Sequence, residues 1–285
     1  MSAVTFARRS ASEEVFHPCY YEEAHLKYAR MHLPVAPKCN IQCRFCSRAF
    51  DCANETRPGV TSRILSPAEA LDRVREVAAR LPNLSVIGIA GPGEPLANQE
   101  TIETLKLVSE AYPDKYLCLA TNGLLLPEYA DRLASIGVGY VTVTINALDP
   151  RVGSDVYSWV RCDGVTLRDA DAFQYLSRNQ WEGLARCVDS GMVVKVNSVL
   201  IPGLNEAELP RIAERARQAG AFVMNVIPFL PVKGSEFQDR KAPSALETKA
   251  ARDECRRFLR QIGHCARCRA DAVGLLGCDL SASFH

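Results

Sequence analysis

Three cysteines lie within eight residues of the chain, at Cys39, Cys43 and Cys46. The spacing supplies three thiolates and no fourth one nearby. A cubane 4Fe-4S cluster takes four ligands, normally four cysteines, so a cluster held here would keep one iron free of protein ligands. In a catalytic metal site, such an open position is where the chemistry takes place. A structural zinc site usually pairs one C-x2-C with a second. The spacing therefore favours an iron–sulfur cluster with an open iron over zinc or a set of buried thiols.

Nine further cysteines need an explanation, because the chain of 285 residues contains twelve. Cys52 follows Cys46 closely, Cys118 falls in an apolar stretch, and Cys19 precedes the first predicted strand. Cys265 and Cys268 form a C-x2-C pair. A single buried cysteine is usually a small hydrophobic residue, and this is the interpretation for Cys162, Cys187, Cys255 and Cys278. The other thiolates could hold one or two additional clusters.

A glycine-rich break follows an apolar run that ends at Ala90. In the sequence Gly91-Pro92-Gly93-Glu94-Pro95, glycine permits close approach of the backbone to a ligand. The Glu94 carboxylate can accept hydrogen bonds from a positively charged amino group. Taken alone, the stretch is a tight turn, because glycine and proline mark turns generally.

Polar residues also interrupt the later apolar runs. Thr121, Asn122 and Gly123 form a good turn signal, and Thr144 and Asn146 close another run. Each of these residues has an ordinary structural explanation. Lys195 and Asn197 lie in an apolar stretch and could point into the interior, although a lone lysine there more often extends its ammonium to the surface.

The elements that would position these residues alternate regularly. After a short helical stretch at 22–30, a first strand begins at 31 and leads into the cysteine loop. Apolar runs rich in branched residues predict strands, and capping and periodic patterns predict helices. Strands are predicted at 31–37, 84–90, 116–120, 140–146, 192–200 and 222–227, and helices at 66–80, 98–111, 127–135, 171–190, 205–219 and 243–261, with 147–169 irregular.

Strands alternating with helices predict parallel strands joined by right-handed crossovers. A complete (βα)8 barrel would need two more pairs, so we expect an α/β fold with a partial (βα)6 TIM-like barrel. Its loops at the carboxyl ends of the strands should gather on one face, where α/β proteins place ligands. We divide the chain into an N-terminal extension at 1–30, a barrel core at 31–242 and a C-terminal helix with the C-x2-C segment at 243–285.

The formal net charge is +1, with acidic and basic residues interspersed. This balance gives no indication of a nucleic-acid or membrane surface. No apolar run approaches the length of a membrane span, and the first ten residues lack the apolar core of a signal peptide. We expect a cytoplasmic protein and a monomer, in which clustered cysteines bind metal rather than form disulfides.

The C-x3-C-x2-C string resembles the motif of the radical S-adenosylmethionine (SAM) superfamily. The resemblance implies that the open iron chelates SAM through its amino and carboxylate groups. An electron from the cluster then cleaves SAM to a 5′-deoxyadenosyl radical. Phe45 stands where the family commonly has an aromatic residue near the adenine. By the same resemblance the SAM pocket is lined by Gly93, Glu94, Asn122, Thr144, Asn146 and Val196.

Within that superfamily, several stretches resemble the NifB family of nitrogenase cofactor maturases. The matching stretches are 17–20, 35–43, 51–55, 57–60, 121–124, 194–203 and 264–277. The resemblance implies an enzyme that fuses two 4Fe-4S clusters into an 8Fe-9S core with a central carbide. SAM would supply both the carbide carbon and the radical, and the ninth sulfur would come from another source. This is a carbide synthase reaction of lyase or transferase type.

The same resemblance implies three 4Fe-4S clusters. Cys39, Cys43 and Cys46 would hold the SAM cluster. Cys19, Cys52 and Cys118 would hold one auxiliary cluster, and Cys265 and Cys268 the second. His17 and His25 are candidate extra ligands, since imidazole suits iron, and a packing or surface role for either is as good an explanation.

The resemblance also implies partners, namely iron–sulfur cluster donors, a reductant such as ferredoxin, and downstream cofactor carrier or scaffold proteins. Many members of the family carry a further carrier domain, and we expect this chain to be the short form without it. Two other functions fit the motif. One is a radical SAM enzyme that acts on a peptide or small molecule and uses auxiliary clusters for electron transfer. The other is a non-enzymatic iron–sulfur carrier.

Overall fold

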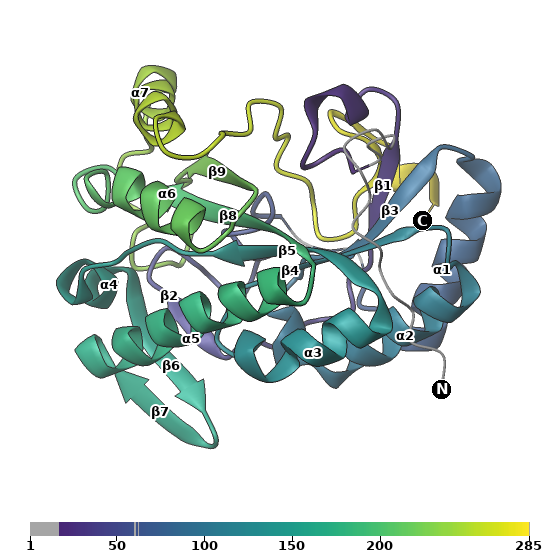
Figure 1. The fold of residues 1–285 in the computed structure, drawn as a ribbon, viewed down its shortest axis with the longest axis horizontal. Coiled ribbons are helices and arrows are strands. Elements are labelled where there is room, and N and C mark those ends of the chain that lie inside the picture. Colours follow the sequence, from purple (N-terminus) through teal and green to yellow (C-terminus); the bar gives the residue numbers. More distant parts are fainter. Residues whose placement is uncertain (1–16, 60, 62, 285) are drawn as a thin grey trace.

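The computed structural model describes residues 17–59, 61 and 63–284. Its main sheet has eight strands in the order β11-β10-β1-β3-β4-β5-β8-β9 (Figure 1). Six of these strands are parallel to their neighbours. They are β1 (Ala29–His32), β3 (Leu84–Ile89), β4 (Tyr116–Thr121), β5 (Val138–Thr144), β8 (Val193–Leu200) and β9 (Val223–Pro228). The predicted parallel sheet of six strands and the partial-barrel fold are confirmed.

Helices cover the outer face of the curved sheet (Figure 1). Two of them begin at recognisable signals, a capping box on the first helix and a proline near the start of the third. Ser66 caps the first helix through a capping box, in which Ser66 Oγ accepts from the Glu69 N–H and the Glu69 carboxylate accepts from the Ser66 N–H, satisfying two otherwise free donors. The covering helices are α1 (Pro67–Arg80), α2 (Gln99–Ala111), α3 (Leu126–Ile136), α5 (Asp169–Asp189) and α6 (Glu208–Gln218). Their apolar sides and the strands form the main core.

A small second sheet supports the cysteine loop. It consists of β2 (Ile41–Cys43), β6 (Tyr157–Cys162) and β7 (Val165–Arg168), all antiparallel. The hairpin of β6 and β7 lies between α4 (Pro150–Val156) and α5, in the segment that the sequence predicts to be irregular. Because β2 carries Cys43 and pairs with β6, this hairpin fixes the start of the cysteine motif against the barrel.

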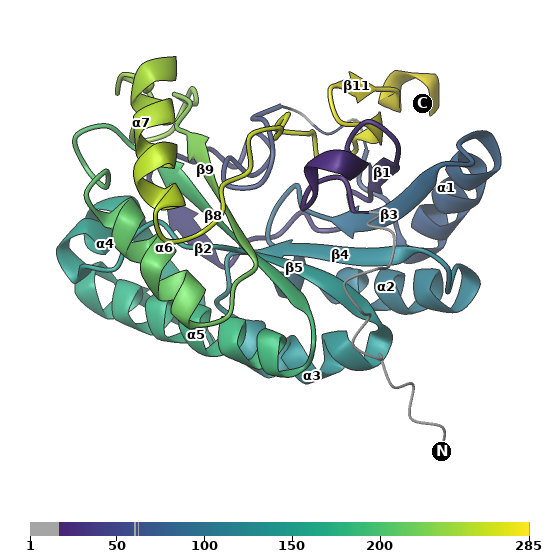
Figure 2. The ribbon, with the colours of Figure 1, turned by 45° about the horizontal axis from the view of Figure 1, so that its top comes forward.

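The C-terminal part closes the open side of the barrel. After α7 (Ala245–Arg256), an irregular segment crosses from β9 to β1, and Gln261 forms an isolated bridge with Met224 on β9. The segment then forms β10 (Val273–Leu275), antiparallel to β1, followed by β11 (Cys278–Asp279). Figure 2 shows this crossing above the sheet. Short 3-10 turns occur at η1 (Glu22–Ala24), η2 (Pro95–Ala97) and η3 (Ser281–Phe284).

Three predicted elements are wrong in extent. The first strand, predicted at 31–37, is β1 and covers only Ala29–His32. The helical stretch at 22–30 is only the η1 turn, because Ala29 and Arg30 belong to β1 and pair with β3. The last helix ends at Arg256 rather than at 261, where the chain turns back to pair with Met224. The division of the chain into three parts stays a prediction, and residues 1–16 lie outside the described residues. Within the described ranges, no helix is both long and apolar enough to cross a bilayer.

Candidate active site

The cysteine loop begins on β2 and turns back immediately. Cys46 N–H donates to the Cys43 carbonyl at 3.0 Å, and the Gln42 side-chain amide donates to the carbonyls of both Cys43 and Cys46. Phe45, inside this turn, is buried in the apolar cluster beneath the loop. These contacts bring Cys39, Cys43 and Cys46 to the wall of one small cavity.

The glycine-rich break after β3 forms the opposite wall. Gly93 N–H donates to the Ala36 carbonyl at 2.6 Å, and Glu94 N–H donates to the Lys38 carbonyl at 2.8 Å. A Cβ atom on Gly93 would lie only 2.2 Å from the Lys38 carbonyl oxygen. Glycine is therefore required here for close backbone packing, which holds Glu94 beside the cysteine loop.

Glu94 is buried, and its carboxylate accepts three hydrogen bonds. The donors are the Thr121 hydroxyl at 2.6 Å, the Asn122 N–H at 2.6 Å and the Leu96 N–H at 3.0 Å. Burial raises the pKa of Glu94 to about 7, and these donors oppose that shift. A neighbouring cation would favour the carboxylate form further. Together with Gly93 and Asn122, Glu94 lines the same cavity as the three cysteines.

The donor set fits a three-thiolate cluster with SAM beside it. Burial raises the pKa of Cys39 to about 11 and the pKa values of Cys43 and Cys46 in the same direction. Cationic iron would offset this desolvation by binding the thiolates. Among the described residues, no three His, Cys, Asp or Glu side chains are arranged to hold a single metal ion. A cubane binds each thiolate through a different iron, so its ligands stand farther apart than those of one ion.

Cys52 lies in this first cavity and not with Cys19 and Cys118, with which the sequence analysis groups it. Its N–H donates to the Pro92 carbonyl at 2.9 Å, which draws the loop toward the glycine-rich break. The cavity therefore has a fourth thiol close to the three of the motif. The assignment of Cys52 to an auxiliary cluster stays a prediction.

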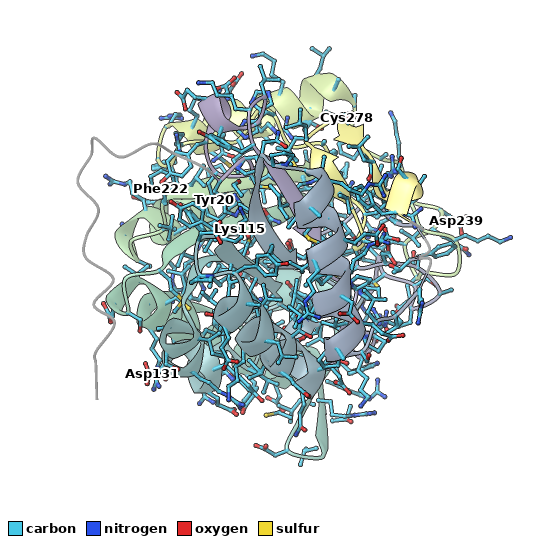
Figure 3. The ribbon with its side chains drawn as sticks, turned by 90° about the vertical axis from the view of Figure 1, so that its right-hand side faces the viewer. Tyr20, Lys115, Asp131, Phe222, Asp239 and Cys278 are labelled. Atoms are coloured by element: carbon cyan, nitrogen blue, oxygen red, sulfur yellow. The ribbon has the colours of Figure 1, made fainter. Side chains whose placement is uncertain are left out.

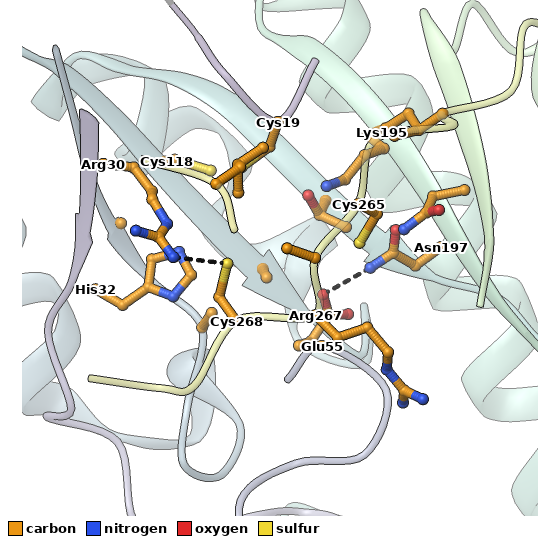
Figure 4. A pocket seen from close by; sticks show the side chains of 18 of the residues that line it. Cys19, Arg30, His32, Glu55, Cys118, Lys195, Asn197, Cys265, Arg267 and Cys268 are labelled. Carbon is orange, nitrogen blue, oxygen red and sulfur yellow. Dashed lines mark hydrogen bonds between the residues drawn. The ribbon is translucent and has the colours of Figure 1, made fainter. Parts of the chain in front are cut away.

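A second cavity, with about 720 Å³ of empty space, lies on the concave side of the sheet. Four cysteines from widely separated segments line it: Cys19, Cys118, Cys265 and Cys268 (Figure 4). Cys19 precedes β1, Cys118 is on β4, and the other two belong to the C-terminal crossing segment. Burial raises the pKa of both Cys19 and Cys118 to about 12. All four are predicted ligands of auxiliary clusters by the family resemblance, and the structure brings them together in one cavity.

Two histidines of this cavity present a ring nitrogen that could bind metal. His17 is buried; its Nδ1 accepts from the Cys19 N–H at 3.2 Å and its Nε2 has no hydrogen-bond partner, so a metal at Nε2 would replace the proton on that nitrogen. His32, on β1, approaches the Arg269 carbonyl through Nδ1 at 3.1 Å. If Nδ1 is the protonated nitrogen, Nε2 keeps its lone pair for a ligand. His25, the other candidate from the sequence, does not line the cavity and stacks on His264.

Glu55 separates the two cavities and lines both of them, as does Ala120. The Glu55 carboxylate accepts hydrogen bonds from the Thr144 hydroxyl and from Asn197 Nδ2. Burial raises the pKa of Glu55 to about 7, while the Thr144 hydrogen bond and the Lys195 charge lower it. The cavities are therefore adjacent, with one titratable side chain at their boundary.

The remaining predicted SAM residues are near the site but do not line its cavity. Thr144 is buried and bonded to Glu55. Asn146 donates to the Asn54 side chain at 3.1 Å and accepts from the Val199 N–H. Val196 packs in the main core. Their roles toward SAM stay predictions.

Sequence reasoning missed His32, Glu55 and Arg30 as residues of the cavities. The signal was present for Glu55, because it follows Cys52 by three positions in a cysteine-bearing loop. Arg30 and His32 both lie on β1, whose residues were assigned partly to a helix. Of the cysteines interpreted as structural, Cys187 and Cys255 are buried in the core. Cys162 lies on the hairpin and Cys278 on an exposed edge (Figure 3).

Comparison with known proteins supports this arrangement. The Radical SAM superfamily model matches residues 33–216. The chain is 47% identical over 279 residues to the FeMo cofactor biosynthesis protein NifB of Klebsiella pneumoniae, covering 96% of this chain and 60% of that protein. It is 48% identical over 277 residues to the protein of that name from Frankia alni, covering 94% and 54% respectively. The chain thus spans little more than half the length of these relatives.

Among solved structures, the chain resembles Streptococcus suis SuiB, with a TM-score of 0.57 and 14% identity, over 82% of this chain and 49% of that one. At this identity the likeness concerns the fold alone. The predicted resemblance to NifB is confirmed by the curated relatives. With its motif, its partial barrel and the family match over most of its length, the chain belongs to the radical SAM superfamily.

Proposed function

We propose that this chain is a NifB-type radical SAM enzyme that makes an 8Fe-9S-carbide precursor of the nitrogenase cofactor from two 4Fe-4S substrates. The observation that carries the proposal is the second cavity. Cysteines from three distant segments converge there, directly beside the cavity that holds the SAM motif. Similarity to NifB over 96% of the chain supports the same reaction.

In the first cavity, Cys39, Cys43 and Cys46 would hold the resident cluster, and Glu94 would receive the amino group of SAM. When bound, this cluster would supply the electron that cleaves SAM to the 5′-deoxyadenosyl radical. Glu94 is suited to its role because its carboxylate is fixed by three donors and has no cationic partner within ion-pair distance among the described side chains. It lines the same cavity as Cys39, Asn122 and Glu55, so a SAM bound there would lie between the motif and Glu55.

In the second cavity, the four-cysteine set would hold the two substrate clusters, Cys19 and Cys118 on one side and Cys265 and Cys268 on the other. Pairs of thiolates leave each cubane with open corners, which His17 or His32 could fill. An incompletely ligated cluster can leave as product. We propose that methyl carbon from SAM becomes the carbide, and that a separate source provides the ninth sulfur.

Partners follow from this chemistry. The substrate clusters require iron–sulfur donor proteins, the resident cluster requires a one-electron reductant such as ferredoxin, and the product requires a carrier or scaffold protein. We propose three 4Fe-4S sites in a monomer, and therefore about twelve irons in the fully loaded chain.

Following isotopically labelled methyl carbon of SAM tests the proposal. The chain is reconstituted anaerobically with iron and sulfide, reduced, and given methyl-labelled SAM. We expect label in a cluster-bound, acid-labile product and about twelve irons per chain before turnover. Label that remains in SAM-derived small molecules, with only about four irons bound, would contradict the proposal. Reductive SAM cleavage coupled to a peptide or small organic substrate would instead identify the alternative radical SAM enzyme.

A further inference from the structure

Three cationic side chains line the second cavity, at Arg30, Lys195 and Arg267, against the single carboxylate of Glu55. Glu55 does not form a direct ion pair with any of them, since it accepts from Thr144 and Asn197. Among the described residues, none of the three cations has a carboxylate within 4.0 Å. The cavity is therefore positively charged in the absence of a bound anion.

Arg30 is the most deeply buried of these cations, at 2% exposure. Its Nη1 donates to the Gly274 carbonyl at 2.6 Å, and its Nη2 donates to Cys268 Sγ at 3.0 Å. Its Nε is buried without any partner. A buried guanidinium is strongly unfavourable unless it is paired and fully hydrogen-bonded. Arg30 thus lines the cavity with one donor on Cys268 and another donor, at Nε, that has no partner.

Lys195 faces Arg30 from the other side of the cavity (Figure 4). It lies on β8 at 9% exposure, with its ammonium 5.0 Å from the centre of the Tyr20 ring. Its ammonium makes no hydrogen bond to any described residue. A lone lysine in an apolar strand ordinarily extends its ammonium to the surface. The Lys195 ammonium does not. Arg267 differs from both, because it donates to the carbonyls of Pro228 and Ala53 and serves to anchor two loops.

This arrangement fits a compact anion with many acceptor atoms. One arginine could not donate hydrogen bonds to all of them. The sulfides of an iron–sulfur cluster are such acceptors, and hydrogen bonds to cluster sulfur are a known means of tuning clusters. We propose that Arg30 and Lys195 are positioning residues that donate hydrogen bonds to the sulfides of the iron–sulfur substrate from opposite sides. This inference rests on the proposed function, in which the substrate is itself a cluster.

Two consequences separate this role from ordinary packing. A cation beside a cluster stabilises its more negative, reduced state, so removing the cation should move the reduction potential of the auxiliary clusters to more negative values. A substitution that keeps the charge should retain most of the binding, although lysine cannot reproduce the two-pronged donation of arginine. Neither effect is expected if the side chains only fill space.

The experiment compares Lys195→Met and Arg30→Met with Lys195→Arg and Arg30→Lys. Each protein is reconstituted anaerobically with iron and sulfide, and a ferrous chelator is then titrated. We expect the neutral variants to lose half of their auxiliary iron at about tenfold lower chelator concentration. The charge-keeping variants should stay close to wild type. Arg215→Met is the matched control, because this guanidinium lies over the Trp181 ring, 4.4 Å from its centre, and does not line the cavity.

Reductive SAM cleavage and the spectrum of the motif cluster report whether each variant is folded. Equal retention of auxiliary iron and unchanged potentials in the neutral variants would overturn the inference. Loss of the motif cluster together with the auxiliary iron would also overturn it, since it would show a structural role. If wild type itself holds only the motif cluster, the proposed function fails instead, before any variant is compared.

Discussion

Replacing Glu94 with glutamine should weaken SAM binding by a predictable amount. One oxygen of the carboxylate accepts from both Thr121 and Leu96, and the other accepts from the Asn122 N–H. Glutamine keeps one acceptor oxygen and directs an amide N–H₂ at a neighbouring donor. The substitution therefore removes the negative charge that would pair with the SAM ammonium and also leaves a buried donor without a partner.

Hydrogen bonds to charged groups contribute about 1.5–3 kcal/mol, which corresponds to a Kd about 10- to 150-fold higher. The pH dependence adds a second signature. Because burial raises the pKa of Glu94 to about 7, the carboxyl is largely protonated below that pH and must lose its proton to pair with an ammonium. SAM affinity of the wild type should therefore fall as the pH drops below about 7, by up to about tenfold per unit.

Equilibrium dialysis of labelled SAM against the anaerobically reconstituted protein, from about pH 6 to about pH 8, measures both effects. Glu94→Gln should bind weakly with a flatter pH profile. Glu55→Gln removes the other carboxyl with a pKa of about 7 and should keep the Glu94-dependent slope. Glu103→Gln, on the exposed side of α2, is the neutral control. An unchanged Kd and slope in Glu94→Gln would refute the assignment of Glu94 to the SAM ammonium.

Three further predictions follow from the contacts described. Cys52→Ala should keep both the motif cluster and the auxiliary iron, because Cys52 shares a cavity with Cys39, Cys43 and Cys46. Iron analysis checks this prediction. Selective loss of auxiliary iron would instead place Cys52 with the cysteines of the second cavity. Gly93→Ala should lower the free energy of unfolding, measured by urea denaturation, by about 3 kcal/mol, because its Cβ would clash with the Lys38 carbonyl. Gly139→Ala is the control and should change that free energy little, because a Cβ there meets open space. Ser66→Ala should lower the free energy of unfolding by about 1 kcal/mol in the same assay, through loss of the α1 cap; an unchanged urea midpoint would show that the cap is dispensable.

The parallel strands were predictable because each is a short run of branched apolar residues bounded by turn signals. The β6–β7 hairpin was not predicted, although Asp163 and Gly164 form the two-residue turn typical of hairpins. Its strands carry polar and charged residues on exposed positions, so the apolar pattern is weak. β1 begins two residues earlier and ends five residues earlier than the predicted strand, because its partners, β3 and β10, lie far away in the sequence.

The site was predictable where the residue type alone identifies the chemistry. Thiols are recognisable as candidate cluster ligands, so Cys19, Cys118, Cys265 and Cys268 could be selected from the sequence, and the structure places all four in one cavity. Spacing cannot tell which way a loop folds, and the hydrogen bond from Cys52 to Pro92 turns Cys52 toward the other cavity. Buried cations such as Arg30 carry no sequence signal, because an arginine beside a strand usually reaches solvent.

The crossing of the C-terminal segment over the barrel has a consequence for the order in which the two cavities form. Residues that line the first cavity all lie between 39 and 122. The second cavity also needs residues 262–276, and its wall is tied to the early loop through the hydrogen bonds from Arg267 to Ala53 and from Arg57 to Cys268. During synthesis on the ribosome, the motif loop emerges long before the walls of the second cavity can close. The segments that line the first cavity are therefore all synthesised before the segment that closes the second one.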